Sequence, residues 1–227
     1  MPAGLRQSPI AGSATAFGQA SSGGTNLAFN NIEREMTELF ALVGDGFVGA
    51  TDALLSSDQV AAKTLIERDR LIDALYRQLL GTAQTMLKEQ RLSSEDINYL
   101  ITVLRLIPEL ERSGDLAEHI AQRALLGISR EMTPRSRGII QEMNDVGTRM
   151  WRLATDAFCD KNNELASTLD SLDDELDDLH LSLIAEIVTG TMPIALVIEM
   201  AMLARFYERF GDHAVNIARA CAQFSQH

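Results

Sequence analysis

The chain has 227 residues, of which 46% are hydrophobic and 5% aromatic, and it carries a formal net charge of −12. This length suits two domains or two similar halves, and the apolar content is enough to fill a core. A chain this acidic has little affinity for phosphate backbones, which excludes nucleic acid as a direct partner.

Residues 1–26 differ from the rest of the chain. They contain five glycines, several Ser and Thr residues and a single charged residue, Arg6. Since they also lack a periodic apolar face, this composition predicts a disordered N-terminal extension. The segment has neither the charged start nor the apolar run of a secretion signal.

Three helices are predicted in the first half. Apolar residues spaced by three or four positions indicate a helix over residues 29–55. A break at residues 56–58 (Ser-Ser-Asp) precedes a second helix that extends to about residue 89. Ser94 is expected to cap a third helix, which extends to about residue 126. Pro108 lies inside this third helix and predicts a kink or a local break.

The second half repeats this order. Helices are predicted over residues 134–158, over residues 164–188 and from about Pro193 onward. We therefore expect an all-α fold of two tandem three-helix bundles, the first over residues 27–130 and the second over residues 131–227.

No segment is expected to cross a membrane. The most apolar stretch, residues 181–204, is interrupted by Glu186, Gly190, Pro193 and Glu199, so it does not supply an unbroken apolar span. The expectation is a soluble, intracellular protein.

The sequence contains an internal repeat. Residues 111–121 read Glu-Arg-Ser-Gly-Asp-Leu-Ala-Glu-His-Ile-Ala, and residues 208–218 read Glu-Arg-Phe-Gly-Asp-His-Ala-Val-Asn-Ile-Ala, at an offset of 97. Residues 50–53 and 154–157 share Ala-Thr-Asp-Ala at an offset of 104. Matches that follow in the same order indicate a tandem duplication of a unit of about 100 residues.

Each repeat also carries two pairs of carboxylates, with the members of a pair one helical turn apart. Like charges at this i, i+4 spacing repel and cost roughly a few tenths of a kcal/mol. Antiparallel packing of the second and third helices would bring the two pairs together, and clustered carboxylate oxygens suit Mg²⁺, Mn²⁺, Fe or Ca²⁺. The pairs are Asp69 and Asp73, Glu111 and Asp115, Asp173 and Asp177, and Glu208 and Asp212.

The alternative interpretation is that every acidic pair belongs to a solvated helix face. Arg112 and Arg209 would then neutralise the pairs on the third helices through exposed ion pairs, which contribute little. His119 and His213 either support a metal ligand or are simply hydrogen-bonded. Because four pairs recur at matching places in two repeats, we favour a cation site.

Nothing in the sequence indicates an enzyme. It lacks the Glu-x-x-His motif of ferritin-like di-iron oxidases, a Gly-rich phosphate loop, a nucleophile elbow and a Cys/His pairing suited to covalent catalysis.

The repeated sequences at residues 111–121 and 208–218 resemble the duplicated motif of the PhoU family. The segments 69–76 and 173–180 are similar to the other acidic motif of that family, and the resemblance extends from about residue 29 to the C-terminus. Members consist of two similar three-helix bundles, and in some of them the acidic motifs bind metal clusters, chiefly iron. The resemblance therefore implies that the eight carboxylates named above bind multinuclear clusters, of Fe first, with Mn, Mg or Zn as alternatives. His119 stands where the family pattern has Asn.

The same resemblance implies a regulatory role rather than a catalytic one. PhoU-like proteins restrain the phosphate-starvation response. The implied partners are the ATPase subunit of a phosphate ABC transporter and a phosphate-sensing histidine kinase. The implied state is a cytoplasmic homodimer that reaches the membrane only through these partners.

Three other functions stay open on the sequence. The first is a related regulator associated with a secondary phosphate permease. The second is a metal-dependent hydrolase or oxidase, which needs an open coordination site. The third is a purely structural helical scaffold.

Overall fold

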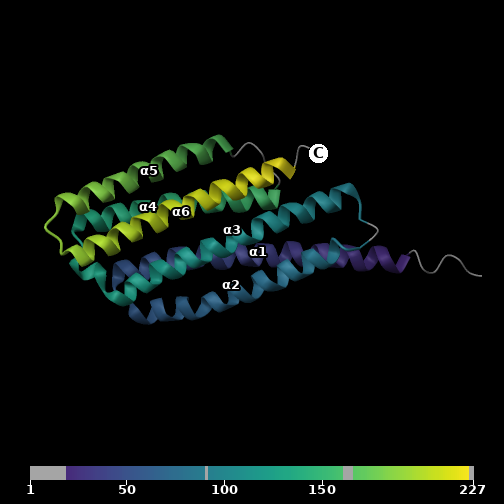
Figure 1. Ribbon diagram of the computed structural model, residues 1–227, viewed down its shortest axis with the longest axis horizontal. Coiled ribbons are helices and arrows are strands. Elements are labelled where there is room, and N and C mark those ends of the chain that lie inside the picture. Colours follow the sequence, from purple (N-terminus) through teal and green to yellow (C-terminus); the bar gives the residue numbers. More distant parts are fainter. Residues whose placement is uncertain (1–18, 90–91, 161–165, 225–227) are drawn as a thin grey trace, which may run out of the picture.

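The computed structural model describes residues 19–89, 92–160 and 166–224 (Figure 1). Within these ranges it contains six long α-helices, one short 3₁₀ helix and no strand. The elements are α1 (Gln19–Ser56), α2 (Gln59–Met86), α3 (Ser94–Leu126), η1 (Ile128–Glu131), α4 (Pro134–Asp160), α5 (Ala166–Thr189) and α6 (Ile194–Phe224).

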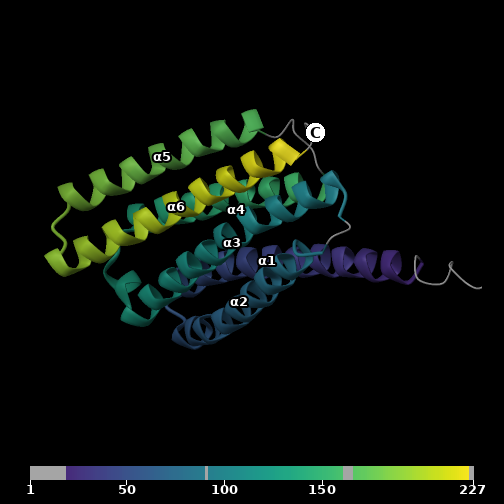
Figure 2. The ribbon, with the colours of Figure 1, turned by 45° about the vertical axis from the view of Figure 1, so that its right-hand side comes forward.

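The long helices form two bundles of three. Helices α1, α2 and α3 pack against one another, and so do α4, α5 and α6. The bundles meet where α3 packs against α6 and where α1 packs against α4. Consequently α3 and α6 lie side by side in the middle of the molecule, and α2 and α5 lie at its outer edges (Figures 1 and 2). The predicted all-α fold of two tandem three-helix bundles is confirmed.

Polar side chains explain where two of the helices begin. The carboxylate of Asp58 accepts hydrogen bonds of 3.0 Å from two backbone N–H groups in the first turn of α2. Ser93 caps α3 and forms a capping box with Asp96. The predicted cap, Ser94, is instead the first residue of the helix, because Asp96 stands at the position that completes a capping box with Ser93.

Helix α1 is longer than predicted. It begins at Gln19, inside the predicted extension 1–26, rather than near residue 29. Ser and Gly are poor helix formers, but these turns prolong a helix that its packed portion already stabilises. The rest of the predicted extension, residues 1–18, lies outside the described residues.

A kink or a local break was predicted at Pro108; helix α3 continues through this residue, so the break does not occur. Proline in a helix interior removes one hydrogen bond and costs about 3 kcal/mol. Leu106, Ile107 and Leu110 around it are fully buried, and α3 contacts α1, α2 and α6. Tertiary packing on several sides therefore holds the helix together across the proline.

Helix α1 also has the length and composition of a membrane span. Its segment Asn26–Ser56 contains a window with a mean hydropathy of 1.4, whereas residues 181–204 were predicted to be the most apolar stretch. In the fold, Met36, Leu39 and Val43 of α1 are fully buried. Their burial in the protein core accounts for the apolar character of this helix.

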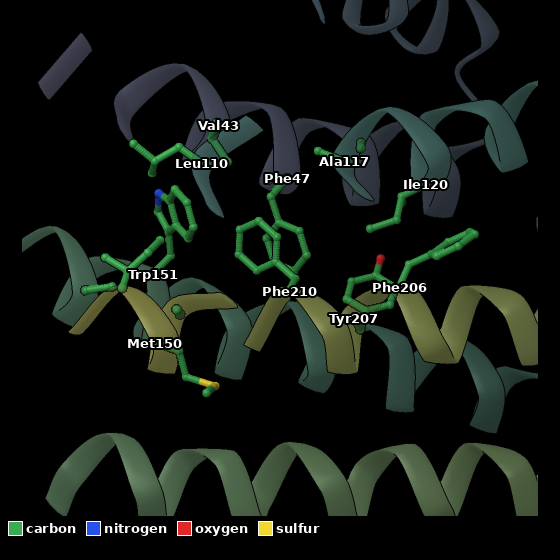
Figure 3. Close-up of a cluster of buried hydrophobic side chains, with 14 of the residues drawn as sticks. Val43, Phe47, Leu110, Ala117, Ile120, Met150, Trp151, Phe206, Tyr207 and Phe210 are labelled. Atoms are coloured by element: carbon green, nitrogen blue, oxygen red, sulfur yellow. The ribbon is translucent and has the colours of Figure 1, made fainter. Parts of the chain in front are cut away.

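The two bundles share one hydrophobic core (Figure 3). Phe47 of α1 and Phe210 of α6 point toward one another and stack, with ring centroids 3.7 Å apart. Trp151 of α4 packs on Phe210 at 4.9 Å. The buried hydroxyls of Thr51 and Tyr207 are hydrogen-bonded at 2.7 Å, so the polar atoms in this layer are satisfied. These contacts join α1 of the first bundle to α4 and α6 of the second.

Candidate functional site

The predicted carboxylates of the first half lie together. Asp69 and Asp73 belong to α2, Glu111 and Asp115 belong to α3, and the two helices pack against each other. Burial first, and then the charges of Glu118 and the other carboxylates, raise the pKa of Asp69 to about 6. Burial and neighbouring carboxylates also raise the pKa values of Glu111 and Asp115. Glu118, one turn beyond Asp115, is a fifth member of this first cluster that the pairwise pattern missed.

The predicted carboxylates of the second half form a matching cluster. Asp173 and Asp177 belong to α5, and Glu208 and Asp212 belong to α6, which packs against α5. Burial, followed by the charges of Asp177 and Asp212, raises the pKa of Asp173. Burial, followed by the charge of Asp212, raises the pKa of Glu208. The fold thus brings together both acidic pairs in each half.

Arginines lie near both clusters and neutralise them only in part; in the first half, Arg77 pairs with Asp73 at 3.9 Å. Arg112 forms its ion pair with Glu109 rather than with the predicted acidic pair on α3. In the second half Arg205, rather than Arg209, pairs with Glu208. Burial and the nearby carboxylates outweigh the charge of Arg205, since the pKa of Glu208 is still raised. Each cluster therefore keeps an excess of negative charge.

The glycine of each repeated motif lets the acidic helices approach closely. A Cβ atom at Gly211 would lie 2.5 Å from Cδ2 of Leu176 on α5. A Cβ atom at Gly114 would lie 3.1 Å from the side chain of Ile72 on α2. A larger residue would separate the helices, and with them the carboxylates. In the sequence these glycines were visible only as matching positions of the two repeats. Their shared place between a Glu and an Asp was the one feature that could have drawn attention to them.

We expect Gly211→Ala to lower the free energy of unfolding by about 1–3 kcal/mol, because the added methyl group overpacks the contact between α5 and α6. Gly138 is the matched control, since a Cβ atom there would meet nothing within 4 Å. Gly138→Ala should instead stabilise the protein by about 0.5–1 kcal/mol through higher helix propensity. Urea unfolding followed by circular dichroism measures both changes. Equal shifts in the two variants would contradict the close approach at Gly211.

The clusters suit a cation by charge and by donor type. Carboxylate oxygens are the ligands that hard and intermediate cations prefer. Oε2 of Glu208 is buried and accepts no hydrogen bond, a cost that a bound cation would remove. Among the described residues, however, no three His, Cys, Asp or Glu side chains lie close enough together to hold a metal ion. The predicted ligands therefore fit a cation chemically, and their side chains would have to rotate to enclose one.

Asp69→Asn is expected to raise the free energy of unfolding of the metal-free protein by roughly 1 kcal/mol at pH 7, a figure reduced for screening by water. The raised pKa means that the folded state binds more protons than the unfolded state between pH 3.8 and about 6. Stability therefore falls as the pH rises through this range. The benefit of the substitution should vanish at pH 3.5. Urea unfolding of the chelator-treated native protein and of Asp69→Asn, at pH 7 and at pH 3.5, measures this stabilisation. A stabilisation of equal size at both pH values would contradict the repulsion among the carboxylates.

A polar contact joins the two bundles through the repeated motif. Nδ1 of His213 lies 2.6 Å from Oε2 of Glu109, and Asn216 donates to the same oxygen at 3.4 Å. Arg112 donates to the other oxygen. Burial by itself would raise the pKa of Glu109, but its hydrogen bond from His213 and the charges of His213 and Arg112 lower it overall. His213 is thus hydrogen-bonded between the halves, and its partner Glu109 was not predicted.

The other end of the α3–α6 contact is built differently. His119 stacks on Phe206 with ring centroids 5.2 Å apart. The guanidinium of Arg123 lies 4.8 Å from the centre of the same ring and pairs with Glu199 at 3.2 Å. An aromatic ring here occupies the place that a carboxylate holds at the first end.

These features define a class of protein: a duplicated helical molecule with one carboxylate cluster in each half. The family model of the PhoU domain matches residues 36–124 and 140–221, one segment in each bundle. The chain belongs to the PhoU family, as the repeated motif predicted.

Similar proteins extend over most of the chain. The phosphate-specific transport system accessory protein PhoU homolog 2 of Mycobacterium tuberculosis is 28% identical over 193 residues, which cover 84% of this chain and 91% of that protein. PhoU homolog 1 of Thermotoga maritima is 26% identical over 193 residues, or 82% of each chain. The crystal structure of PhoU from Pseudomonas aeruginosa has a TM-score of 0.83 and 25% identity, covering 88% of this chain and 98% of that one. The phosphate transport system regulatory protein PhoU from Streptococcus pneumoniae shares the fold, with a TM-score of 0.79.

Proposed function

We propose that this protein is a negative regulator of phosphate uptake and of the phosphate-starvation response. It acts as an adaptor between the ATPase subunit of a phosphate ABC transporter and a phosphate-sensing histidine kinase. The observation that carries the proposal is the match of both bundles to the PhoU domain, together with relatives named as accessory proteins of phosphate-specific transport. The protein works in the cytoplasm as a homodimer and reaches the membrane through its partners.

An adaptor role agrees with the chemistry of the clusters. Excess carboxylates on neighbouring helices present a negative surface, which favours association with basic surfaces on partner proteins. The shared aromatic core fixes the two clusters relative to each other, as a scaffold requires. We propose that the protein regulates by binding and does not catalyse a reaction.

The adaptor function is tested in a host strain that lacks its own PhoU protein. Expression of this chain should restore repression of a phosphate-starvation reporter in phosphate-rich medium, and the chain should co-purify with the transporter ATPase subunit. A chain that binds neither the ATPase subunit nor the kinase, and leaves the reporter active, would overturn the proposal. Co-purification with a secondary phosphate permease alone would assign it to the other transport system.

We propose further that each cluster binds a multinuclear metal centre, of Fe first, with Mn, Mg or Zn as alternatives. The ligands would be Asp69, Asp73, Glu111 and Asp115 in the first half and Asp173, Asp177, Glu208 and Asp212 in the second. Their crowding and raised pKa values support the proposal, since a bound cation would offset the repulsion.

Elemental analysis of protein purified without an affinity metal column measures the metal. We expect several equivalents of metal in the native protein and a loss of about half in Asp177→Asn/Asp212→Asn, because one cluster is disabled. Asp174→Asn/Asp178→Asn is the matched control, since it removes two exposed carboxylates of the same helix that are not predicted ligands. Trace metal in all three proteins would return the clusters to a role as surface charge.

A further inference from the structure

The ends of α5 and α6 that meet at the connecting turn carry an exposed apolar surface. Its five residues are between 44% and 79% exposed, far more than side chains of this size in the core. Soluble proteins seldom gather large apolar side chains on one surface unless something binds there. We call this surface the α5–α6 apolar patch, and it consists of Leu181, Val188, Ile194, Ile198 and Met202.

Helical spacing places these residues on outward faces. Ile194, Ile198 and Met202 are separated by four positions each, so they line one side of α6. Leu181 and Val188 are separated by seven positions and line one side of α5. The two helices pack against each other, and α5 lies at the outer edge of the molecule in both views (Figures 1 and 2). The patch is therefore open to a partner.

The α5 side of the patch is acidic. Asp174, Leu181 and Val188 follow at intervals of seven, so the outward face of α5 passes from carboxylate to apolar toward the turn. Between Lys161 and Arg205 the chain has nine Asp and Glu residues and no Lys or Arg. Glu186 and Glu199 pair with arginines of other helices, and Arg205, one turn beyond Met202, pairs with Glu208. The unpaired negative charge therefore lies on the α5 side of the patch. An apolar surface bordered by negative charge is complementary to a surface that combines apolar and basic side chains.

The equivalent surface of the first half has arginines in place of two of the apolar residues. Ile97 and Ile101, at the offset of 97 from Ile194 and Ile198, are also exposed. Arg77, at the offset of 104, corresponds to Leu181, and Arg105, at the offset of 97, corresponds to Met202. The first half therefore has a smaller apolar area with basic residues beside it, and it provides an internal control.

We propose that the α5–α6 apolar patch is a docking site for an amphipathic helix of a partner protein, one with apolar residues along one face and Lys or Arg along its borders. Such a helix places anchors at i, i+3 or i+4 and i+7 into apolar contacts, and its basic borders meet the carboxylates of α5. A membrane surface rich in anionic lipids is disfavoured, because the acidic residues repel it. A second copy of this chain is disfavoured because its α5 brings the same carboxylates to this face.

The probe for this site is a fluorescent model peptide made only of Leu and Lys in a helical pattern. It should bind the native protein more tightly than a Leu/Glu peptide of the same pattern, as measured by fluorescence anisotropy. Ile194→Ser/Ile198→Ser should weaken binding by about tenfold or more, as expected for loss of interface anchors. Ile97→Ser/Ile101→Ser should change it by less than about twofold. Both variants alter exposed side chains, so circular dichroism should show the native helix content.

Three results would overturn the proposal. The first is equal binding by the native protein and Ile194→Ser/Ile198→Ser, or equal weakening in both variants. The second is a native dimer that becomes a monomer only in Ile194→Ser/Ile198→Ser by light scattering, which would assign the patch to a second copy. The third is sedimentation with vesicles containing phosphatidylserine that is lost in the same variant, which would assign the patch to a membrane.

The inference rests on the proposed adaptor function, and one comparison separates the two. If the transporter ATPase subunit or the kinase binds the native protein but not Ile194→Ser/Ile198→Ser, the adaptor function and the docking site both stand. If either partner binds the native protein and this variant equally, the adaptor function stands and the docking site fails. If neither partner binds the native protein, the adaptor function fails, and the peptide experiment alone decides the docking site.

Discussion

Phe47→Ala is expected to lower the free energy of unfolding by about 3–5 kcal/mol, the usual cost of truncating a fully buried phenylalanine. Phe47 belongs to the first bundle but stacks on Phe210 of the second at 3.7 Å and lies 5.4 Å from the ring of Tyr207. The cavity would open at the junction of the bundles, so both should lose stability together. Thermal and urea unfolding measure the change.

Two probes show whether the halves unfold as one unit. Trp151 is the only tryptophan of the chain, and its indole N–H donates to the carbonyl oxygen of Phe40 at 3.0 Å across the contact between α4 and α1. Its fluorescence reports on the junction, whereas circular dichroism reports on all helices. Coincident transitions are expected in the native protein and in Phe47→Ala. Separate transitions, or a loss no greater than that of the exposed control Leu126→Ala, would contradict a shared core.

Glu109→Ala is expected to lower the free energy of unfolding by about 2–3 kcal/mol at pH 7, because it removes a largely buried carboxylate and leaves its donors unpaired. The carboxylate bonds to His213 and Asn216 of the other bundle and to Arg112 of its own helix. A double-mutant cycle with His213→Ala should give a coupling of about 1–2 kcal/mol. Urea unfolding of the four proteins measures it.

The pH dependence of this coupling follows from the lowered pKa of Glu109. A carboxyl group with a lowered folded pKa contributes its full stabilisation above the unfolded value of 4.5 and loses it as the pH falls through the folded value. The coupling should therefore be present at pH 7 and weaken below pH 4. Glu109→Gln should lose less stability than Glu109→Ala, since its amide oxygen still accepts a hydrogen bond. A coupling near zero at pH 7 would remove this contact as a link between the bundles.

Much of the fold could be predicted because its signals are local. Apolar spacing, the break before α2 and the proline that begins α4 predicted the helices, and the repeat predicted two equal bundles. The break at Pro108 and the start of α1 were wrongly predicted, because tertiary packing outweighs local propensity there. The same packing explains how α1 can have the hydropathy of a membrane span inside a protein core.

The acidic pairs were predictable because duplication repeats them at matching positions and because antiparallel neighbours must bring them together. Glu109 was not, since its partners His213 and Asn216 lie in the other half and no spacing within one repeat reveals them. Gly114 and Gly211 were visible as matches, but their effect depends on how closely α2 and α5 approach them. Contacts between helices distant in sequence are thus the part that required the structure.

The unlike ends of the α3–α6 contact bear on how the protein evolved. At the repeat offset of 97, Glu109 corresponds to Phe206, and His119 corresponds to Asn216. An ancestor with a single repeat, assembled as a symmetric pair, would have had to carry identical residues at both ends. Fusion of two such copies would remove that constraint, and in this protein one end has a carboxylate among donors while the other has an aromatic ring. A substitution that benefits one half no longer has an automatic counterpart in the other, which leaves the halves free to specialise for different partners.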